Sequence, residues 1–147
     1  MRGEADLKTL LKNMQPLADE REFVFCSIDA ATLSQLSIKP TGWFREAEGV
    51  TLIIDKKQAD KYMLHYGSVW SLITLTIHSD LTAVGFLATI TDALGKSGIS
   101  VNVVSAYYHD HLFVPYTECE HAIEVLGRLS NGYPNELSRQ VDRGGGN

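Results

Sequence analysis

The sequence has few of the residues that mark secreted, membrane or nucleic-acid-binding proteins. It contains two cysteines in 147 residues and no apolar run of the 18 or more residues that a bilayer requires. Its 13 Lys and Arg residues are outnumbered by 18 Asp and Glu residues, and the formal net charge is −5. A nucleic-acid-binding face needs a basic excess to displace counterions from phosphate. These features argue against a nucleic-acid partner and against a membrane span.

The two cysteines favour a reducing compartment. Cys26 falls in an apolar, strand-like run and Cys119 in a helix-like run, and thiols in such places behave as small buried hydrophobes more often than as a disulfide. The segment from Met1 to Met14 mixes charged residues with leucines, so it lacks the continuous apolar region of a signal peptide. We therefore expect a cytoplasmic protein.

Hydrophobic residues make up 44% of the chain and charged residues 21%, a balance typical of globular domains. In the first half, Leu7, Leu10, Leu11 and Met14 follow helical spacing and predict a short helix that ends at Pro16. A buried strand is predicted over 22–28, and a hairpin over 42–45 and 50–54. Asp55 and Gln58 resemble a capping box that opens a second short helix.

The second half repeats this order with clearer signals. A strand is predicted over 69–77, then a helix whose apolar stripe is Ala83, Leu87, Ile90 and Leu94 and which ends at Gly98. Strands are predicted over 99–106 and 112–114, joined by a polar hairpin tip over 107–111. Thr117 and Glu120 form a capping box for a last helix.

Both halves thus end in a hairpin followed by a capped helix, which predicts two similar units in tandem. We expect an α+β protein with two ferredoxin-like units, each an antiparallel sheet with helices on one face. The predicted boundaries are 1–66 for a divergent N-terminal unit and 67–130 for the second unit. Residues 131–147 are rich in Gly and polar residues and predict a flexible, dispensable tail.

Three segments of the second half resemble the ACT domain family: Ser79-Asp-Leu-Thr-Ala-Val-Gly-Phe-Leu87, Leu94-Gly-Lys-Ser-Gly-Ile-Ser-Val-Asn102, and the strand–hairpin–strand over 104–115. The first is similar to the family's loop between its first strand and first helix, and the second to its glycine-isoleucine start of the next strand. The resemblance is to a stand-alone tandem protein of the amino-acid-sensing branch. It implies a regulatory, non-catalytic module that binds an amino acid at interfaces between ACT units and forms a homodimer.

The loop over 78–86 is the best candidate for a ligand site. A polar loop that leads into a helix presents free backbone N–H groups at a positive dipole end, which suits a carboxylate. Ser79 and Thr82 add hydroxyl groups, Asp80 suits an ammonium group, and Gly85 allows close approach to the backbone. A plain helix cap is the alternative for this loop. The predicted ligand-binding residues are His78, Ser79, Asp80, Leu81, Thr82, Val84, Gly85, Asn102 and Ser105.

Two other functions are left open by the sequence. His109 and His111 share one face of a strand and could converge on a metal ion, which would suit a metal-dependent enzyme. A purely structural interaction module is the second alternative. No P-loop, GxGxxG, HExxH or paired CxxC motif is present, so we assign no cofactor, no metal and no catalytic residue.

Overall fold

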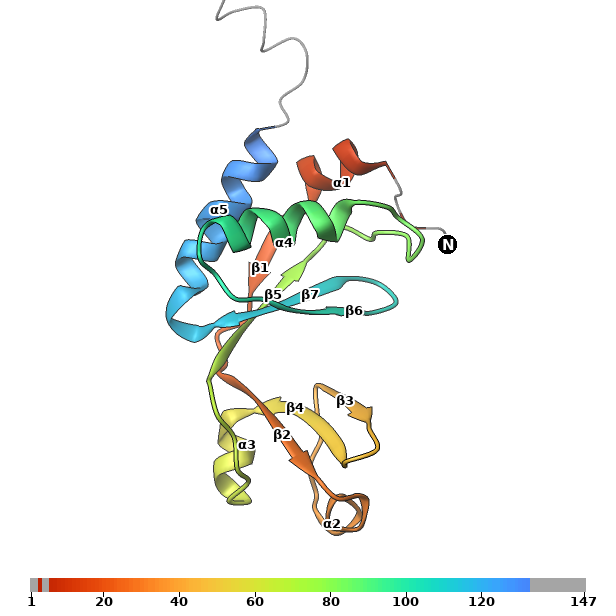
Figure 1. Cartoon of the computed structure of the whole chain (residues 1–147), viewed down its shortest axis with the longest axis vertical. Helices are drawn as coiled ribbons and strands as arrows, with labels where there is room; N and C mark the ends of the chain where they lie inside the picture. Colours follow the sequence, from red (N-terminus) through yellow and green to blue (C-terminus); the bar gives the residue numbers. More distant parts are fainter. Residues whose placement is uncertain (1–2, 4–5, 133–147) are drawn as a thin grey trace, which may run out of the picture.

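The computed structural model describes residue 3 and residues 6–132 of the chain. It has a mixed architecture in which strands form one curled antiparallel sheet and helices pack on the outside (Figure 1). Residues 133–147 of the predicted tail 131–147 lie outside the described residues, and Asn131 is the last residue of helix α5 (Cys119–Asn131). Within the described part of the chain, no helix is both long and apolar enough to span a bilayer.

The first unit consists of β2 (Phe23–Ile28), α2 (Ala30–Gln35), β3 (Gly42–Arg45), β4 (Val50–Asp55) and α3 (Lys56–Lys61). The predicted hairpin is confirmed, with Trp43 opposite Leu52. The helix start at Asp55 is also confirmed, because its side chain accepts a hydrogen bond from the backbone N–H of Lys57 at 2.9 Å. Alternate residues of β2 and β4 bury one small core, which contains Val24, Cys26, Val50, Leu52, Ile54 and Ala59.

The second unit consists of β5 (Trp70–Leu75), α4 (Phe86–Lys96), β6 (Asn102–Ser105), β7 (Asp110–Pro115), a short 3-10 turn η1 (Tyr116–Glu118) and α5 (Cys119–Asn131). Its strands pair in the order β5–β7–β6. The last helix starts later than predicted, since Glu118 is its N-cap and makes no side-chain capping bond. Thr117 lies in the 3-10 turn instead.

The start of the chain packs on the second unit, although the sequence places it before the first. Helix α1 (Leu7–Asn13) buries Leu10, Leu11 and Met14 against residues of α4 and α5. Strand β1 (Pro16–Ala18), which the sequence analysis did not predict, pairs antiparallel with β5, Pro16 lying opposite Leu75. The βαββα order of the second unit is thereby completed to six elements by a strand from the opposite end of the sequence.

The two units meet at an aromatic cluster between β2 and β5. These strands pair at a single position, Phe23 opposite Trp70. Phe113 of β7 makes edge-to-face contacts with Phe23 and Phe25, at centroid distances of 5.9 Å and 5.3 Å. Because this cluster lies on the sheet faces turned away from the helices of both units, it joins the units without contributing to either helix-covered core.

Candidate functional site

The predicted ligand loop forms a small hollow at the end of β5 and the start of α4. Its volume is about 120 Å³, and its walls come from the loop, the first turn of α4, and the ends of β6 and β7. Five of the nine predicted residues line it: Ser79, Asp80, Leu81, Gly85 and Ser105. The other four, which are His78, Thr82, Val84 and Asn102, are not among its lining residues.

A buried carboxylate is the chief polar feature of this hollow. Asp110 is 6% exposed and accepts a hydrogen bond from the Ser79 hydroxyl, with 2.8 Å between Oγ and Oδ2. Asp110 belongs to the predicted polar hairpin tip over 107–111 and was not among the predicted ligand-binding residues. The burial of Asp110 could have been predicted from the two-residue period of a strand. Asp110, Leu112 and Val114 are every second residue of β7, so their side chains all point to the helix-covered face. A carboxylate at the first of these positions is therefore enclosed rather than exposed.

Asp80 stabilises the loop itself. Its Oδ1 accepts a hydrogen bond from the backbone N–H of Thr82 at 2.8 Å and another from the Thr82 hydroxyl, and its carbonyl oxygen accepts from Ala83 N at 2.9 Å. This is an Asx turn, in which the side chain replaces a backbone acceptor. Gly3 lies directly against this turn, because a Cβ there would be 2.6 Å from the carbonyl carbon of Ser79.

Gly85 is where the loop becomes a helix. The helix begins at Phe86, three residues later than the predicted stripe from Ala83, and its N-cap Gly85 has a φ of 86° in the left-handed region. A Cβ at Gly85 would meet Leu7 of α1 at 3.7 Å. The glycine is therefore needed for the backbone conformation, and the N–H groups that follow it belong to the first turn of α4.

We expect Gly85→Ala to destabilise the protein by about 1–2 kcal/mol, the cost of a left-handed non-glycine residue. The same substitution at Gly95, in the last turn of α4 with open space around it, is the matched control and should be neutral or stabilising by up to about 1 kcal/mol. Thermal unfolding of both variants is the measurement. Equal melting temperatures would contradict the left-handed conformation at Gly85.

Asn102, one of the predicted ligand-binding residues, lies away from the hollow. Strand β6 is an edge of the sheet, and Asn102 is exposed and lies opposite Phe113, whereas Ser105 lies opposite Asp110 at the hollow. Ser105 and Asn102 lie three positions apart and so point to opposite faces of the strand. Only Ser105 can contribute to this site.

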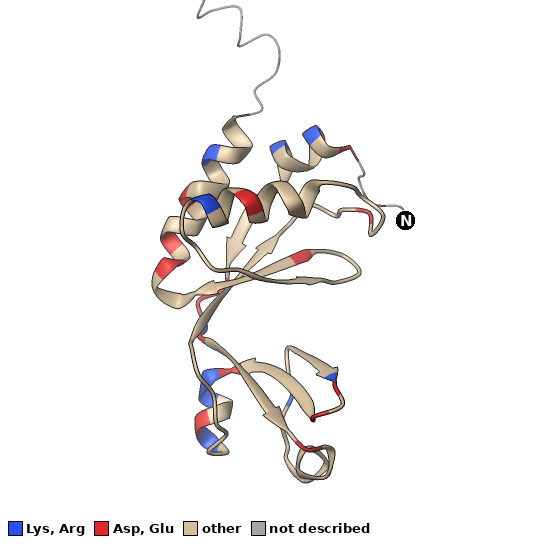
Figure 2. Cartoon of the chain, viewed as in Figure 1, with Lys and Arg blue, Asp and Glu red and all other residues tan. Residues whose placement is uncertain are grey.

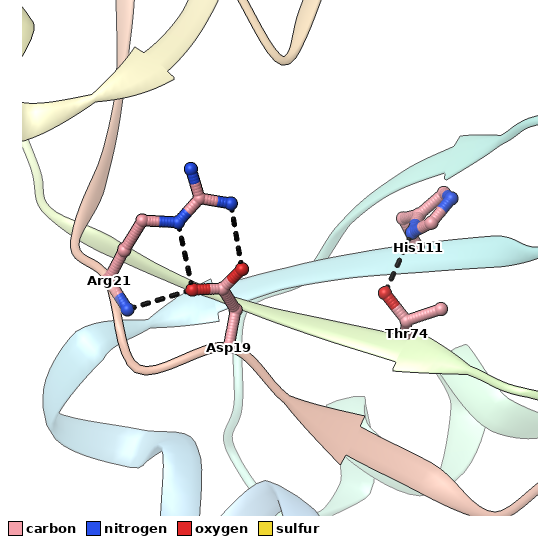
Figure 3. Close-up of polar contacts among 4 residues, drawn as sticks. All are labelled: Asp19, Arg21, Thr74 and His111. Carbon is pink, nitrogen blue, oxygen red and sulfur yellow. Dashed lines mark hydrogen bonds and ion pairs between the residues drawn. The ribbon is translucent and has the colours of Figure 1, made fainter.

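The histidines of the hairpin have separate environments. His109 and His111 lie with ring centroids 6.4 Å apart, and His111 Nδ1 is 2.9 Å from the hydroxyl of Thr74 on β5 (Figure 3). Burial lowers the pKa of His111, and neighbouring His109 lowers it further. Asp110 points to the opposite face. Among residues 3 and 6–132, no group of three or more His, Cys, Asp and Glu side chains is arranged to hold a metal ion.

The two cysteines lie in different cores and are both free. Burial raises the pKa of the Cys26 thiol, which disfavours the reactive thiolate. These thiols therefore contribute no nucleophile to the hollow.

The fold and the hollow together define a class: a tandem αβ protein with a small depression at a strand–helix loop. The family models agree, because two ACT-domain models match the chain, one over residues 2–71 and the other over residues 68–128. The chain belongs to the ACT domain family. A comparison with curated proteins gives no match.

Several solved structures share this fold. A protein of unknown function from Vibrio cholerae, VC0802, described as a possible transport protein, is 40% identical, with a TM-score of 0.77 over 84% of this chain and 95% of that one. The regulatory subunit of aspartate kinase from Thermus thermophilus is 10% identical, with a TM-score of 0.60 over 80% of this chain and 98% of that one. Aspartate kinase from Clostridium acetobutylicum is 12% identical, with a TM-score of 0.58 over 78% and 34%. The two kinase structures show the fold alone.

Proposed function

We propose that this protein is a regulatory module that binds a free amino acid in the hollow at the start of α4 and has no catalytic activity of its own. The observation that carries the proposal is the buried Ser79–Asp110 pair beside the first turn of a helix. Asp110 suits an α-ammonium group, and the N–H groups of Phe86 and Leu87 suit an α-carboxylate. A zwitterion matches both ends of this hollow.

A thermal-shift screen of the purified protein against the twenty amino acids tests the proposal. At 100 times its Kd, a ligand adds about 2.7 kcal/mol to the free energy of unfolding. Stabilisation by one amino acid or by a few related ones would support the proposal. If none of the twenty stabilises the protein, the proposed ligand class is wrong.

The variant Asp110→Asn locates the binding site. The amide oxygen still accepts the Ser79 hydrogen bond, but the negative charge that attracts an ammonium group is removed. We expect the affinity for the stabilising amino acid to fall about ten-fold or more, since a charged hydrogen bond contributes roughly 1.5–3 kcal/mol. Asp92→Asn, on an exposed position of α4 paired with Lys96, should leave it unchanged. Unchanged affinity in Asp110→Asn would place the ligand elsewhere.

We further propose that the protein is a homodimer. Strand β6 leaves an edge of the sheet open, and the surface near it exposes Val104, Tyr107 and Tyr108. Light scattering at micromolar concentration should give about twice the chain mass of 16.3 kDa, and Val104→Lys should shift the mass toward the monomer. A monomer mass for the unmodified chain would reject the dimer.

The cytoplasmic location remains a prediction.

A further inference from the structure

A second, larger hollow lies at the opposite end of β5 from the ligand loop. Its volume is about 360 Å³, within the size range of small-molecule sites. It lies between the link from β1 to β2, the start of β5 and the start of α5, and it shares no lining residue with the loop hollow. Figure 2 shows acidic positions in both of the segments that border it, the β1–β2 link and the first part of α5.

Ser71 provides a buried polar group on the wall of this hollow. It is 2% exposed, and its hydroxyl makes no hydrogen bond to any residue within 3 and 6–132. No side-chain polar atom in that part of the chain is both fully enclosed and unpaired, so the unpaired hydroxyl must be the part of Ser71 that meets the hollow. A hydroxyl without a protein partner on the wall of a hollow is open to a partner from outside the chain, either water or a ligand.

The carboxylates around the hollow differ in their availability. Arg21 neutralises Asp19: its backbone N and Nε donate to Oδ1 at 2.9 Å and 3.1 Å, and Nη2 donates to Oδ2 at 2.8 Å (Figure 3). These hydrogen bonds lower the pKa of Asp19. Glu20 and Glu120 also line the hollow, and neither forms an ion pair with a described residue. Two negative charges are thus left unneutralised at the rim.

Glu120 belongs to the first turn of α5, where it offsets the positive end of the helix dipole. No Lys or Arg side chain of the described residues lines the hollow, so an anionic ligand would meet repulsion there. A metal ion is also disfavoured, because these carboxylates do not form a group able to hold one. The ligand class that fits these residues is an organic cation with N–H groups that donate hydrogen bonds.

We propose that this hollow binds a small primary ammonium compound, whose N–H groups donate to the Ser71 hydroxyl and to the carboxylates of Glu20 and Glu120. The ammonium group has three donors, and Ser71, Glu20 and Glu120 offer it one uncharged and two charged acceptors at the hollow. The proposal is independent of the amino-acid site, because the two hollows lie at opposite ends of β5.

Isothermal titration calorimetry of the full chain with 1,4-diaminobutane at low ionic strength tests the proposal. We expect saturable binding of one diamine per chain. Ser71→Ala should weaken it about ten-fold or more, because the ammonium donor makes this a charged hydrogen bond. The double variant Glu20→Gln/Glu120→Gln changes only exposed side chains and should remove measurable binding. Glu124→Gln, an exposed position of α5 paired with Arg128, is the matched control and should bind like wild type.

The bis-quaternary derivative of the diamine, in which each nitrogen carries three methyl groups, distinguishes hydrogen bonding from charge attraction, because it has the same two positive charges without N–H groups. It should bind wild type far more weakly than the diamine does. Asp110→Asn should bind the diamine like wild type, which separates this site from the loop hollow. The proposal is overturned if the diamine produces no saturable heat, if its bis-quaternary derivative binds equally well, or if the double variant binds like wild type.

Discussion

Replacing Leu11 by Ala should lower the free energy of unfolding by about 2–5 kcal/mol, the range for removing a large aliphatic side chain from a packed core. Leu11 lies in α1 and is fully buried in the same cluster as Ile90 of α4 and Leu126 of α5. The loss should therefore appear in the second unit although the substitution is near the start of the chain. Urea denaturation of the purified variant measures it.

The matched control is Leu17→Ala in β1, because Leu17 is 63% exposed and its side chain should contribute less than about 0.5 kcal/mol. Equally small effects at both positions would show that α1 does not pack on the second unit. Equally large effects would show that β1 also buries its outer face, for instance in the dimer proposed above.

Replacing Phe113 by Ala should cost about 3–5 kcal/mol, the usual loss for a buried phenylalanine. The variant removes the ring that contacts Phe23 and Phe25 of the first unit. Strands β2 and β5, which join the two units, pair at a single position. Without the Phe113 ring, the two units should therefore unfold less cooperatively. Calorimetry should show a broadened or divided transition in place of a single one.

Phe44→Ala is the control for Phe113→Ala, since Phe44 lies on edge strand β3 and is 71% exposed. It should leave both the melting temperature and the shape of the transition nearly unchanged. A single sharp transition in Phe113→Ala would contradict the role of this ring as the link between units.

Most of the helices and strands could be predicted from the sequence, because they carry a strong local pattern. The helical spacing of Leu7, Leu10 and Leu11 and the β-branched run of β4 each determine one element with little help from the rest of the chain. The order of these elements and the ACT-like segments 79–87, 94–102 and 104–115 predicted the tandem ACT fold. The family models confirm it.

The errors occurred where a long-range contact decides the structure. Strand β1 is only three residues long and contains Pro16, so nothing local marks it, and its pairing with Ile73 to Leu75 is what makes it a strand. The same limit applies to the hollow at α4. Its loop was found from its polar sequence, but Asp110 reaches it through the register of β7 against β5, with Asp110 opposite Leu75.

The docking of α1 and β1 on the second unit also determines when the molecule can fold as it is synthesised. Pro16 pairs with Leu75, and the cluster around Leu11 needs Leu126 as well, so the first elements made must wait for nearly the last. At about 5–20 residues per second, that wait lasts roughly 5–25 seconds. The first unit can complete its own core in the meantime. The second unit can close only after α5 has left the ribosome, and until then the apolar face of α1 remains uncovered.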